Sequence, residues 1–343
     1  MYTVFKGSYT GVIIKEELTI PELQQDEVLV KITHSGLCAT DELFRNDPVA
    51  LGHEGNTKIS IGAGHAIALG PDVRTVEIGD AVAFGLQHSS CGSCAQCLSG
   101  NDNYCPLRRL QGFDDPDLGS FSTHAIVKAS FLFRIEGPMD LRHAAPLICA
   151  GATVFGPMCV YDVRPEHRVG IIGFGGLGHL AVQFAAKVGC EVVVFSRTDA
   201  KKKEAMEMGA TEFVVTQIER SLEILEGRKR GIDHLFLTSS VLVDDWDFLL
   251  NLLNPGGAVH LLTASPGSDL VMPYTTIVRQ GLKIQGSLIA PRHAVRKMLD
   301  FALWHSIRPV VQEWPMTIEG ITEAMETLKL GKVRYRAVLV NDT

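Results

Sequence analysis

The sequence predicts a two-domain α/β protein, in which a β-rich domain is followed by a doubly wound parallel sheet. Up to about residue 148, short alternating runs such as "EVLVKITHSG" are separated by glycine-rich turns, which is typical of half-buried strands. From about residue 150, apolar strand-like runs alternate with segments of helical length, which is typical of a parallel sheet with helices on both faces. The 343 residues suffice for two domains that each bury a core.

The elements of the second domain follow one another closely. Apolar runs predict strands at 168–173, 191–196, 211–216, 231–240, 258–263 and 282–288. Helical segments are expected between them at 176–189, 199–210 and 244–257. Beyond about residue 290, the sequence predicts two further helices and a closing strand, at 294–306, 317–331 and 335–340.

Composition and charge exclude several classes of protein. With 46% hydrophobic and 21% charged residues, the chain is expected to be folded and not disordered. The formal net charge of -7 disfavours a nucleic-acid partner, because no overall basic field is available to displace counterions. We expect no membrane span and no signal peptide, because polar residues interrupt the most apolar region and the start lacks a charged segment before an apolar one. A cytoplasmic, reducing location follows.

Four of the eight cysteines lie in one short stretch, "CGSCAQCLSGNDNYC", as Cys91, Cys94, Cys97 and Cys105. In a reducing compartment such a cluster is more typical of a metal site than of disulfides. Four thiolates can close a tetrahedron around zinc and leave no open position, so this zinc would be structural. An iron–sulfur cluster is the alternative, since Pro106 follows the last cysteine as it does in many such clusters.

A glycine-rich turn after the first strand of the second domain predicts a dinucleotide site. Gly173, Gly175 and Gly178 form a G-x-G-x-x-G pattern that also contains Gly176 and Leu177. The first glycine permits the tight turn, the second lets the backbone approach a pyrophosphate, and the third allows close packing of helix on strand. The N-terminus of the helix would then face the phosphates.

The end of the next strand predicts which dinucleotide is bound. NAD-binding proteins place an acidic residue there to hold the ribose 2′-hydroxyl. This chain has Ser196, followed by Arg197 and Lys201, which suit a 2′-phosphate through charge-assisted hydrogen bonds. We therefore expect NADP(H) in preference to NAD(H).

A second set of metal-binding residues is scattered along the first domain. Cys38 lies in "GLCATDE", His53 and Glu54 lie in "GHEG", and Cys149 lies at the junction with the second domain. Two cysteines and a histidine with an open fourth position make a catalytic zinc site. Each residue alone is more typical of a structural role, because a small buried cysteine is common, so the prediction depends on their combination beside a nucleotide domain.

These motifs resemble those of the zinc-dependent medium-chain alcohol dehydrogenases. The resemblance is strongest to the NADP-linked, cinnamyl-alcohol-dehydrogenase-like branch, particularly its fungal-type members. It covers nearly the whole chain and includes C-x-T-D at Cys38, Thr40 and Asp41, GHE at 52–54, the four-cysteine lobe, "GGLGHLAVQFAAKVG" and the closing "RYRAVLV".

The resemblance implies a fold, a set of cofactors and an assembly. A GroES-like catalytic domain would comprise 1–149 and 288–343, with the cysteine lobe at about 88–108, and a Rossmann domain would comprise 150–287. Such enzymes use NADP(H), carry two zinc ions per chain (one catalytic and one structural), act on small-molecule substrates and are usually homodimers.

The resemblance also assigns catalytic roles. Cys38, His53 and Cys149 would hold the catalytic zinc, Glu54 would lie beside the metal and ligate it transiently, and Thr40 would deliver a proton to the substrate oxygen. Zinc polarises a carbonyl oxygen so that hydride from the nicotinamide reaches the carbon. The expected reaction is hydride transfer between nicotinamide and an aldehyde, ketone or alcohol.

One departure from the family pattern leaves the reduced bond open. Many relatives carry a histidine five residues after the zinc cysteine, which links the hydroxyl to solvent, but this chain has Leu43 there and Ala39 directly after the cysteine. Losing such acid–base assistance costs about 10²- to 10⁴-fold in rate. Members of the fold without the relay include reductases of iminium or conjugated C=C bonds in natural-product metabolism, which are the alternative.

A second departure lies beside the GHE motif. If 56–62 is treated as an insertion, the family's glycines fall at Gly64 and Gly70, and His65 becomes an ordinary strand residue. The insertion begins two residues after Glu54, so it either reshapes the substrate pocket or displaces His53 from the metal. A non-catalytic nucleotide-binding scaffold is therefore a further alternative, which zinc content would distinguish from an enzyme.

Overall fold

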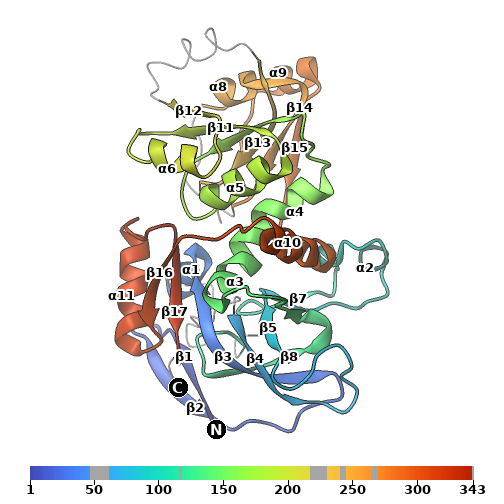
Figure 1. Cartoon of the computed structure of the whole chain (residues 1–343), viewed down its shortest axis with the longest axis vertical. Helices are drawn as coiled ribbons and strands as arrows, with labels where there is room; N and C mark the ends of the chain where they lie inside the picture. Colours follow the sequence, from blue (N-terminus) through green and yellow to red (C-terminus); the bar gives the residue numbers. More distant parts are fainter. Residues whose placement is uncertain are drawn as a thin grey trace. The chain divides into compact units, whose positions relative to one another are not determined.

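The computed structural model describes residues 1–46, 62–115, 118–216, 230–239, 245–263, 267 and 269–341. The chain divides into two compact units, Met1–Cys149 with Pro291–Thr343, and Ala150–Ala290. The first unit is discontinuous in sequence, because the second unit is inserted into it (Figure 1).

A seven-stranded, mostly antiparallel sheet forms the centre of the first unit. Its strand order is β16-β17-β3-β4-β5-β9, and β8 also pairs with β3. Only the pair β16 and β17 is parallel among these neighbours. The strands are β3 (Glu27–Leu37), β4 (Gly62–Leu69), β5 (Ala81–Phe84), β8 (His124–Lys128), β9 (Phe133–Arg134), β16 (Val311–Pro315) and β17 (Arg336–Val340).

Smaller sheets and helices complete this unit. β1 (Tyr2–Lys6) pairs with β2 (Ile14–Leu18), and β6 (Gln87–Ser89) pairs with β7 (Arg109–Leu110). The helices and 3-10 turns are α1 (Ala39–Asn46), α2 (Ala95–Leu98), η1 (Asp102–Tyr104), η2 (Ala129–Phe131), α3 (Leu141–Pro146), α10 (Arg292–Trp304) and α11 (Ile318–Lys329).

The second unit is a six-stranded parallel sheet in the order β12-β11-β10-β13-β14-β15. Its strands are β10 (Arg168–Ile172), β11 (Glu191–Ser196), β12 (Glu212–Val215), β13 (Ile232–Leu237), β14 (Leu253–Leu261) and β15 (Lys283–Gly286). Helices α5 (Gly178–Val188) and α6 (Lys202–Glu207) lie on one side of the sheet, and α8 (Trp246–Asn251) and α9 (Tyr274–Gln280) on the other (Figure 1). The strand order reverses between β10 and β13, as in Rossmann folds. The predicted fold class is confirmed.

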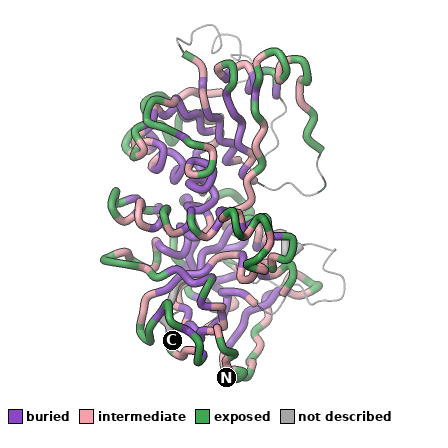
Figure 2. The backbone as a smooth tube through the Cα atoms, turned by 90° about the vertical axis from the view of Figure 1, so that its right-hand side faces the viewer, coloured by how far each residue is buried: buried purple, intermediate pink, exposed green. Residues whose placement is uncertain are grey.

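Burial follows the two kinds of sheet. β10 and β11 are buried along almost their whole length, because helices cover both faces of a parallel sheet. In β8 of the first unit, buried and half-buried residues alternate, as expected where only one face meets the core. Figure 2 shows the buried residues gathered in the interior of each unit.

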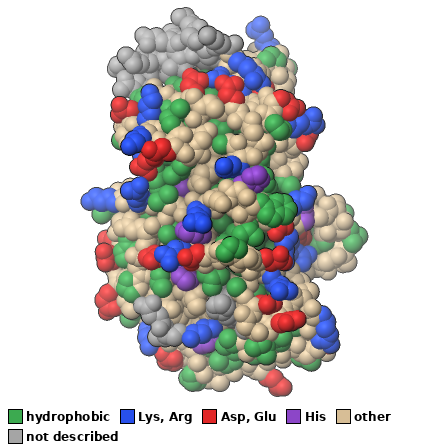
Figure 3. Space-filling model, viewed as in Figure 1, with side chains coloured by type: hydrophobic (Ala, Val, Ile, Leu, Met, Phe, Trp, Pro, Cys, Tyr) green, Lys and Arg blue, Asp and Glu red, His purple; other side chains and the backbone are tan. Residues whose placement is uncertain are grey.

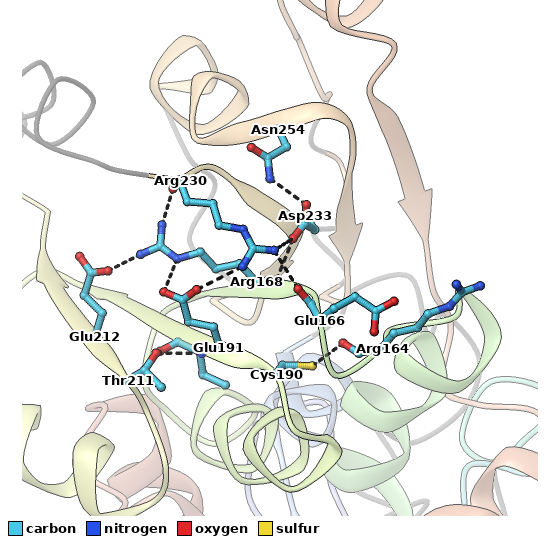
Figure 4. Close-up of polar contacts among 11 residues, drawn as sticks. Arg164, Glu166, Arg168, Cys190, Glu191, Thr211, Glu212, Arg230, Asp233 and Asn254 are labelled. Atoms are coloured by element: carbon cyan, nitrogen blue, oxygen red, sulfur yellow. Dashed lines mark hydrogen bonds and ion pairs between the residues drawn. The ribbon is translucent and has the colours of Figure 1, made fainter.

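Arg168 ties together the first residues of several parallel strands (Figure 4). Its guanidinium bonds to Glu191 at 2.9 Å, to Glu212 and to the carbonyl of Arg230, and its backbone N–H donates to Asp233 at 2.8 Å. Arg168 is only 8% exposed. The amino ends of β10, β11, β12 and β13 are therefore linked by one buried cation.

The pattern of short strands in the first domain does not predict the long helix that crosses residue 150. α3, a π-helical turn (η3, Leu147–Gly151) and α4 (Ala152–Val160) are continuous from Leu141 to Val160. The helix contains two prolines and is apolar on all sides, so it lacks the amphipathic period that predicts surface helices. It is long and apolar enough to cross a membrane, but 78% of its apolar window is buried inside the protein, as in the core helix of a soluble protein.

A second difference concerns the helix expected at 244–257. α8 ends at Asn251, and the following Pro-Gly-Gly belongs to β14, which begins at Leu253.

On the surface, acidic and basic side chains are interspersed over the face seen in Figure 3. Several form local pairs, such as Lys203 with Glu207 on α6.

Candidate active site and cofactor site

The C-x-T-D motif forms the turn between β3 and α1. The backbone N–H of Cys38 donates to Oδ2 of Asp41 at 2.7 Å, and the N–H of Asp41 donates to the carbonyl of Cys38 at 3.1 Å. Asp41 is the third residue of α1, so the arrangement resembles a capping box, in which that residue bonds back to the helix start. The motif therefore holds the buried Cys38 at the end of a central strand.

Cys149 comes from the π-helical turn and meets Cys38, far from it in sequence. The two thiols share a hydrogen bond, which raises the pKa of Cys38 well above its ordinary value, and burial raises it further. The same hydrogen bond lowers the pKa of Cys149. π-turns are frequent at functional sites, and this one presents a candidate ligand.

Two charged residues lie close to this pair of sulfurs. Asp41 is 1% exposed, and burial, followed by the charge of Cys38, raises its pKa well above the usual range. Arg336, the first residue of β17, is 7% exposed, and its Nε and Nη2 atoms have no hydrogen-bond partner within the described part of the chain. Its positive charge favours the thiolate forms of both cysteines.

Arg336 was not among the residues predicted from the sequence. It stands at the start of an otherwise apolar closing strand, and a buried cation in that position is a signal that sequence reasoning can use. Its neighbour Ala337 pairs with Leu37 of β3, which brings the start of β17 beside Cys38.

Thr40 lies in the first turn of α1 and is half-buried. Its hydroxyl hydrogen-bonds to Cys38, an interaction that favours the thiolate. The structure thus brings together Cys38, Thr40 and Cys149. His53 and Glu54 lie outside the described residues.

The insertion proposed at 56–62 also falls outside the described residues, except for Gly62, where β4 begins. The side chain of Leu43 is likewise not described. His65 lies within β4 and pairs with Lys31 of β3, so it is a strand residue, as expected.

The four cysteines of the lobe converge in space. The sulfurs of Cys91, Cys94, Cys97 and Cys105 all lie within 4.8 Å of one another. Sγ of Cys91 is 3.9 Å from that of Cys97 and 3.6 Å from that of Cys105, and sulfurs around one zinc at about 2.3 Å would be about 3.8 Å apart. Backbone N–H groups of Ser93 and Cys94 lower the pKa of Cys91 to about 6. The spacing fits a single ion better than an iron–sulfur cluster, whose cysteines bind separate irons.

The cysteine lobe is tied to the start of α10. Asp102, 3% exposed, accepts hydrogen bonds from the backbone N–H of Arg292 at 3.2 Å and from its Nε at 2.8 Å. The Arg292 guanidinium also lies 4.5 Å from the ring centre of Phe131, and Nδ1 of His293 is 3.1 Å from the carbonyl oxygen of Gly100. Contacts with α10 therefore hold the lobe in place in addition to its four cysteines.

The glycine-rich turn has the geometry that its pattern predicts. Gly173 adopts a positive φ of +91°, and a Cβ on Gly178 would lie 2.0 Å from the Gly173 carbonyl oxygen. A Cβ on Gly175 would meet nothing within 4 Å, so this side of the turn is open. The hydroxyl of Thr238 donates to the carbonyls of Gly173 at 2.8 Å and Ile172 at 2.9 Å and fixes the turn from β13. Thr238 was not predicted from the sequence.

The remaining cofactor candidates lie around this turn. Leu177, which follows Gly176, is the N-cap residue of α5. Ser196 ends β11, and Arg197 follows it, exposed. Nζ of Lys201 donates to the carbonyl of Phe174 at 3.3 Å, so this ammonium group lies against the glycine-rich turn.

The comparisons with known proteins agree with this geometry. Residues 24–137 match the profile of the alcohol dehydrogenase GroES-like domain, and residues 176–304 match that of the zinc-binding dehydrogenases. A probable formaldehyde dehydrogenase of Bacillus subtilis (strain 168) is 33% identical over 339 residues, which span 94% of this chain and 93% of that protein. The chain belongs to the zinc-dependent medium-chain dehydrogenases.

This dehydrogenase is of the cinnamyl alcohol dehydrogenase type. A probable cinnamyl alcohol dehydrogenase of Oryza sativa subsp. japonica is 31% identical, over 96% of this chain and 93% of that one. The structure of a cinnamyl alcohol dehydrogenase from Sorghum bicolor superposes with a TM-score of 0.88 at 28% identity, covering 99% and 97% of the two chains. One from Helicobacter pylori, complexed with NADP(H), gives 0.86 at 26% identity, with the same coverage. The family recognised from the sequence is confirmed.

Proposed function

We propose that this dehydrogenase is an NADP(H)-linked enzyme that reduces aldehydes or ketones and carries two zinc ions per chain. The observation that carries the proposal is the contact between Cys38 and Cys149, because it brings two soft ligands from distant segments into one site. Relatives with names that include alcohol dehydrogenase and aldehyde reductase support the substrate class.

The donor set of this site fits a catalytic zinc. Cys38 and Cys149 would supply two thiolates, and His53 of the GHE motif would supply a third ligand, which leaves one position open. The buried Arg336, two of whose nitrogens have no partner among the described residues, places positive charge near two sulfurs that must both lose their protons. When bound, zinc supplies a Lewis acid that polarises a carbonyl oxygen, and the reduced nicotinamide supplies the hydride.

Thr40 is the proposed proton donor to the product oxygen. Its hydroxyl already points at Cys38, so it lies at the site where the substrate oxygen would bind. Leu43 cannot pass a proton from Thr40 to solvent, because its side chain has no titratable group. Water or the ribose hydroxyl of the cofactor would complete the path.

The leucine at position 43 also favours a second candidate reaction. Hydride addition to an iminium carbon gives the neutral amine directly, and addition to a conjugated C=C bond gives an enolate that takes its proton on carbon from water. Neither reaction needs Thr40 to protonate an alkoxide. The leucine at position 43 therefore supports this alternative.

A paired measurement of turnover and metal content tests the proposal. NADPH oxidation is followed with aromatic aldehydes, enals and cyclic imines, and zinc is counted per chain. We expect aldehyde turnover and about two zinc ions for the native protein, and one zinc for Cys149→Ser. Turnover of the imines or of the C=C bond alone would select the second candidate reaction.

Cys159→Ser is the matched control, because this half-buried cysteine belongs to neither cysteine set. It should keep both zinc ions and full turnover. One zinc ion per native chain, with no turnover of any of these substrates, would support the scaffold alternative.

Recognition of a 2′-phosphate is proposed for Ser196, Arg197 and Lys201. Arg197→Ala and Lys201→Ala should each raise KM for NADPH at least tenfold while KM for NADH changes little, because only NADPH carries the phosphate. Lys203→Ala is the control, since this lysine is 89% exposed and pairs with Glu207. Equal effects on both cofactors would contradict the assignment.

A homodimer is proposed as the assembly. β15 is an edge strand of the parallel sheet as the described chain forms it. Nearby Val271, Tyr274 and Val278 are 80%, 79% and 61% exposed. An unpaired edge beside exposed apolar side chains is typical of a surface that pairs with another chain.

A further inference from the structure

Three histidines of the nucleotide-binding unit form a connected series, here named the histidine ladder. Nε2 of His234 is 3.2 Å from Nδ1 of His167, and Nδ1 of His234 is 3.0 Å from Nε2 of His260. The rings of His234 and His260 stack with centroids 5.3 Å apart, and that of His167 is 4.8 Å from His234. The ladder joins the loop before β10 to β13 and β14, and none of these residues belongs to the proposed active site.

The ladder leads from a surface cavity into the core. The cavity, of about 580 Å³, is lined by His167 and His234. The other lining residues come from the loop before β10 and from β13, β14 and β15. They are Tyr161, Asp162, Arg164, Asp233, Pro255, Gly256, Gly257, Ala258, Lys283 and Gln285. His260 lies behind the cavity with no exposed surface, its ring 4.6 Å from that of Phe236.

The hydrogen bonds impose one direction on the ladder. Nδ1 of His167 accepts from the backbone N–H of Arg164 at 3.0 Å, so the contact with His234 requires His234 to donate from Nε2. Its Nδ1 must then accept from Nε2 of His260. Nδ1 of His260 is left as a buried acceptor without a partner in the described chain. A proton added to that nitrogen would be a buried donor with nothing to accept it.

The carboxylates of Asp233 and Asp162 favour protonation of His234, but burial outweighs them. From the loop before β10, Asp162 is paired with Arg164. Asp233, beside His234 on β13, already bonds to the backbone N–H of Arg168, to Asn254 and to Arg230 (Figure 4). From β15, the charge of Lys283 opposes protonation of His234, as does that of His167.

We infer that the histidine ladder is an acid-sensitive latch, which holds β13 and β14 to the loop before β10 when His234 and His260 are neutral and releases them when these two rings are protonated. The inference does not depend on the proposed reaction, because no residue of the ladder belongs to the proposed zinc site or to the dinucleotide turn. His167 and His234 lie near the amino ends of β10 and β13, and His260 lies within β14.

The direction of the effect follows from proton linkage. Burial is the main cause that lowers the pKa of His234 to about 4 and that of His260 to about 3, whereas an unfolded histidine titrates near about 6.5. The unfolded state therefore binds more protons than the folded state below this pH. Stability is complete above about pH 6.5 and is lost as the pH falls from there towards 4, by about tenfold in the unfolding equilibrium constant per pH unit for each histidine.

Urea unfolding of the full chain at pH 7, 6 and 5 tests the latch. Glutamine keeps an N–H donor but does not titrate, so His234→Gln and His260→Gln should each make the change between pH 6 and 5 about tenfold smaller than in the native protein. His305→Gln is the control, because this histidine is exposed at the end of α10, and it should match the native protein. Identical pH dependence in the native protein and both ladder variants would overturn the inference.

Hydrogen exchange, corrected for the intrinsic effect of pH, locates the opening. Peptides from β13 and β14 should lose protection between pH 7 and 5, while peptides from β3 and β17 of the other unit keep theirs. An equal loss in both units would contradict a local latch. If a glutamine variant does not fold, NMR titration of the native protein decides: two histidines must stay neutral down to about pH 5, and ordinary titration of every ring would overturn the inference.

Discussion

Gly175 and Gly178 stand three positions apart in one turn, yet the structure makes opposite demands on them. A Cβ on Gly178 would overlap the Gly173 carbonyl oxygen at 2.0 Å, whereas a Cβ on Gly175 would meet nothing within 4 Å. Gly178 is therefore required by the fold of the turn. Gly175 is free of that requirement and leaves room for a ligand.

The two substitutions should consequently separate stability from binding. Gly178→Ala should destabilise the protein by about 1–3 kcal/mol, because backbone must move to relieve the overlap. Gly175→Ala should leave stability within about 0.5 kcal/mol but weaken NADPH binding at least tenfold, since its methyl group would occupy the open side of the turn. Thermal unfolding and NADPH fluorescence titration measure the two effects. Equal stability losses in the two variants would contradict this division.

At the residue scale, short-range patterns were the ones that sequence could predict. The positions of Gly173 and Gly178 depend on neighbours within a few residues, and the turn has the expected conformation. Arg336 was missed because its importance depends on β17 pairing with β3, which joins opposite ends of the chain. Thr238 was missed for the same reason, since only the parallel pairing of β10 with β13 brings it to the turn.

At the scale of elements, the cysteine lobe depends on α10 as well as on its metal ligands. Asp102 accepts two hydrogen bonds from Arg292 and is almost fully buried. Asp102→Asn should reduce the free energy of unfolding by about 1–3 kcal/mol, because the charge of Arg292 loses its partner and an amide N–H group would face its donors.

A surface pair provides the comparison for this change. Asp26 lies 3.7 Å from Lys128, and both side chains are about half exposed (50% and 43%), so Asp26→Asn should cost no more than about 0.5 kcal/mol. Urea unfolding measures both variants. If Asp102→Asn behaved like Asp26→Asn, the anchoring of the lobe by α10 would be refuted.

Helices and strands with a regular hydrophobic period were predicted from the sequence. The helix from Leu141 to Val160, which has no such period, was not. The alternation of strands and helices from residue 168 onward predicted a doubly wound parallel sheet, which the structure confirms. The helix from Leu141 to Val160 has no polar face and contains Pro146 and Pro157, so neither periodicity nor propensity indicated it. The π-helical turn that carries Cys149 depends on packing and has no signature in the sequence.

At the scale of the whole molecule, the chain order of the two units has a kinetic consequence. β3 ends at Leu37, and its partner strand β17 supplies Ala337, so the central sheet of the first unit joins the beginning and the end of the chain. The second unit, Ala150–Ala290, is continuous. It can therefore complete its sheet while the first unit still lacks two strands.

During synthesis, the candidate zinc site would accordingly be the last part to form. At translation rates of about 5–20 residues per second, Leu37 waits about 15–60 s for its partner on β17. Cys38 and Cys149 leave the ribosome long before Arg336 does. For that interval the nascent chain carries thiols without the strand that encloses them, so scarce zinc or an oxidant would damage the newly made protein more readily than the finished one.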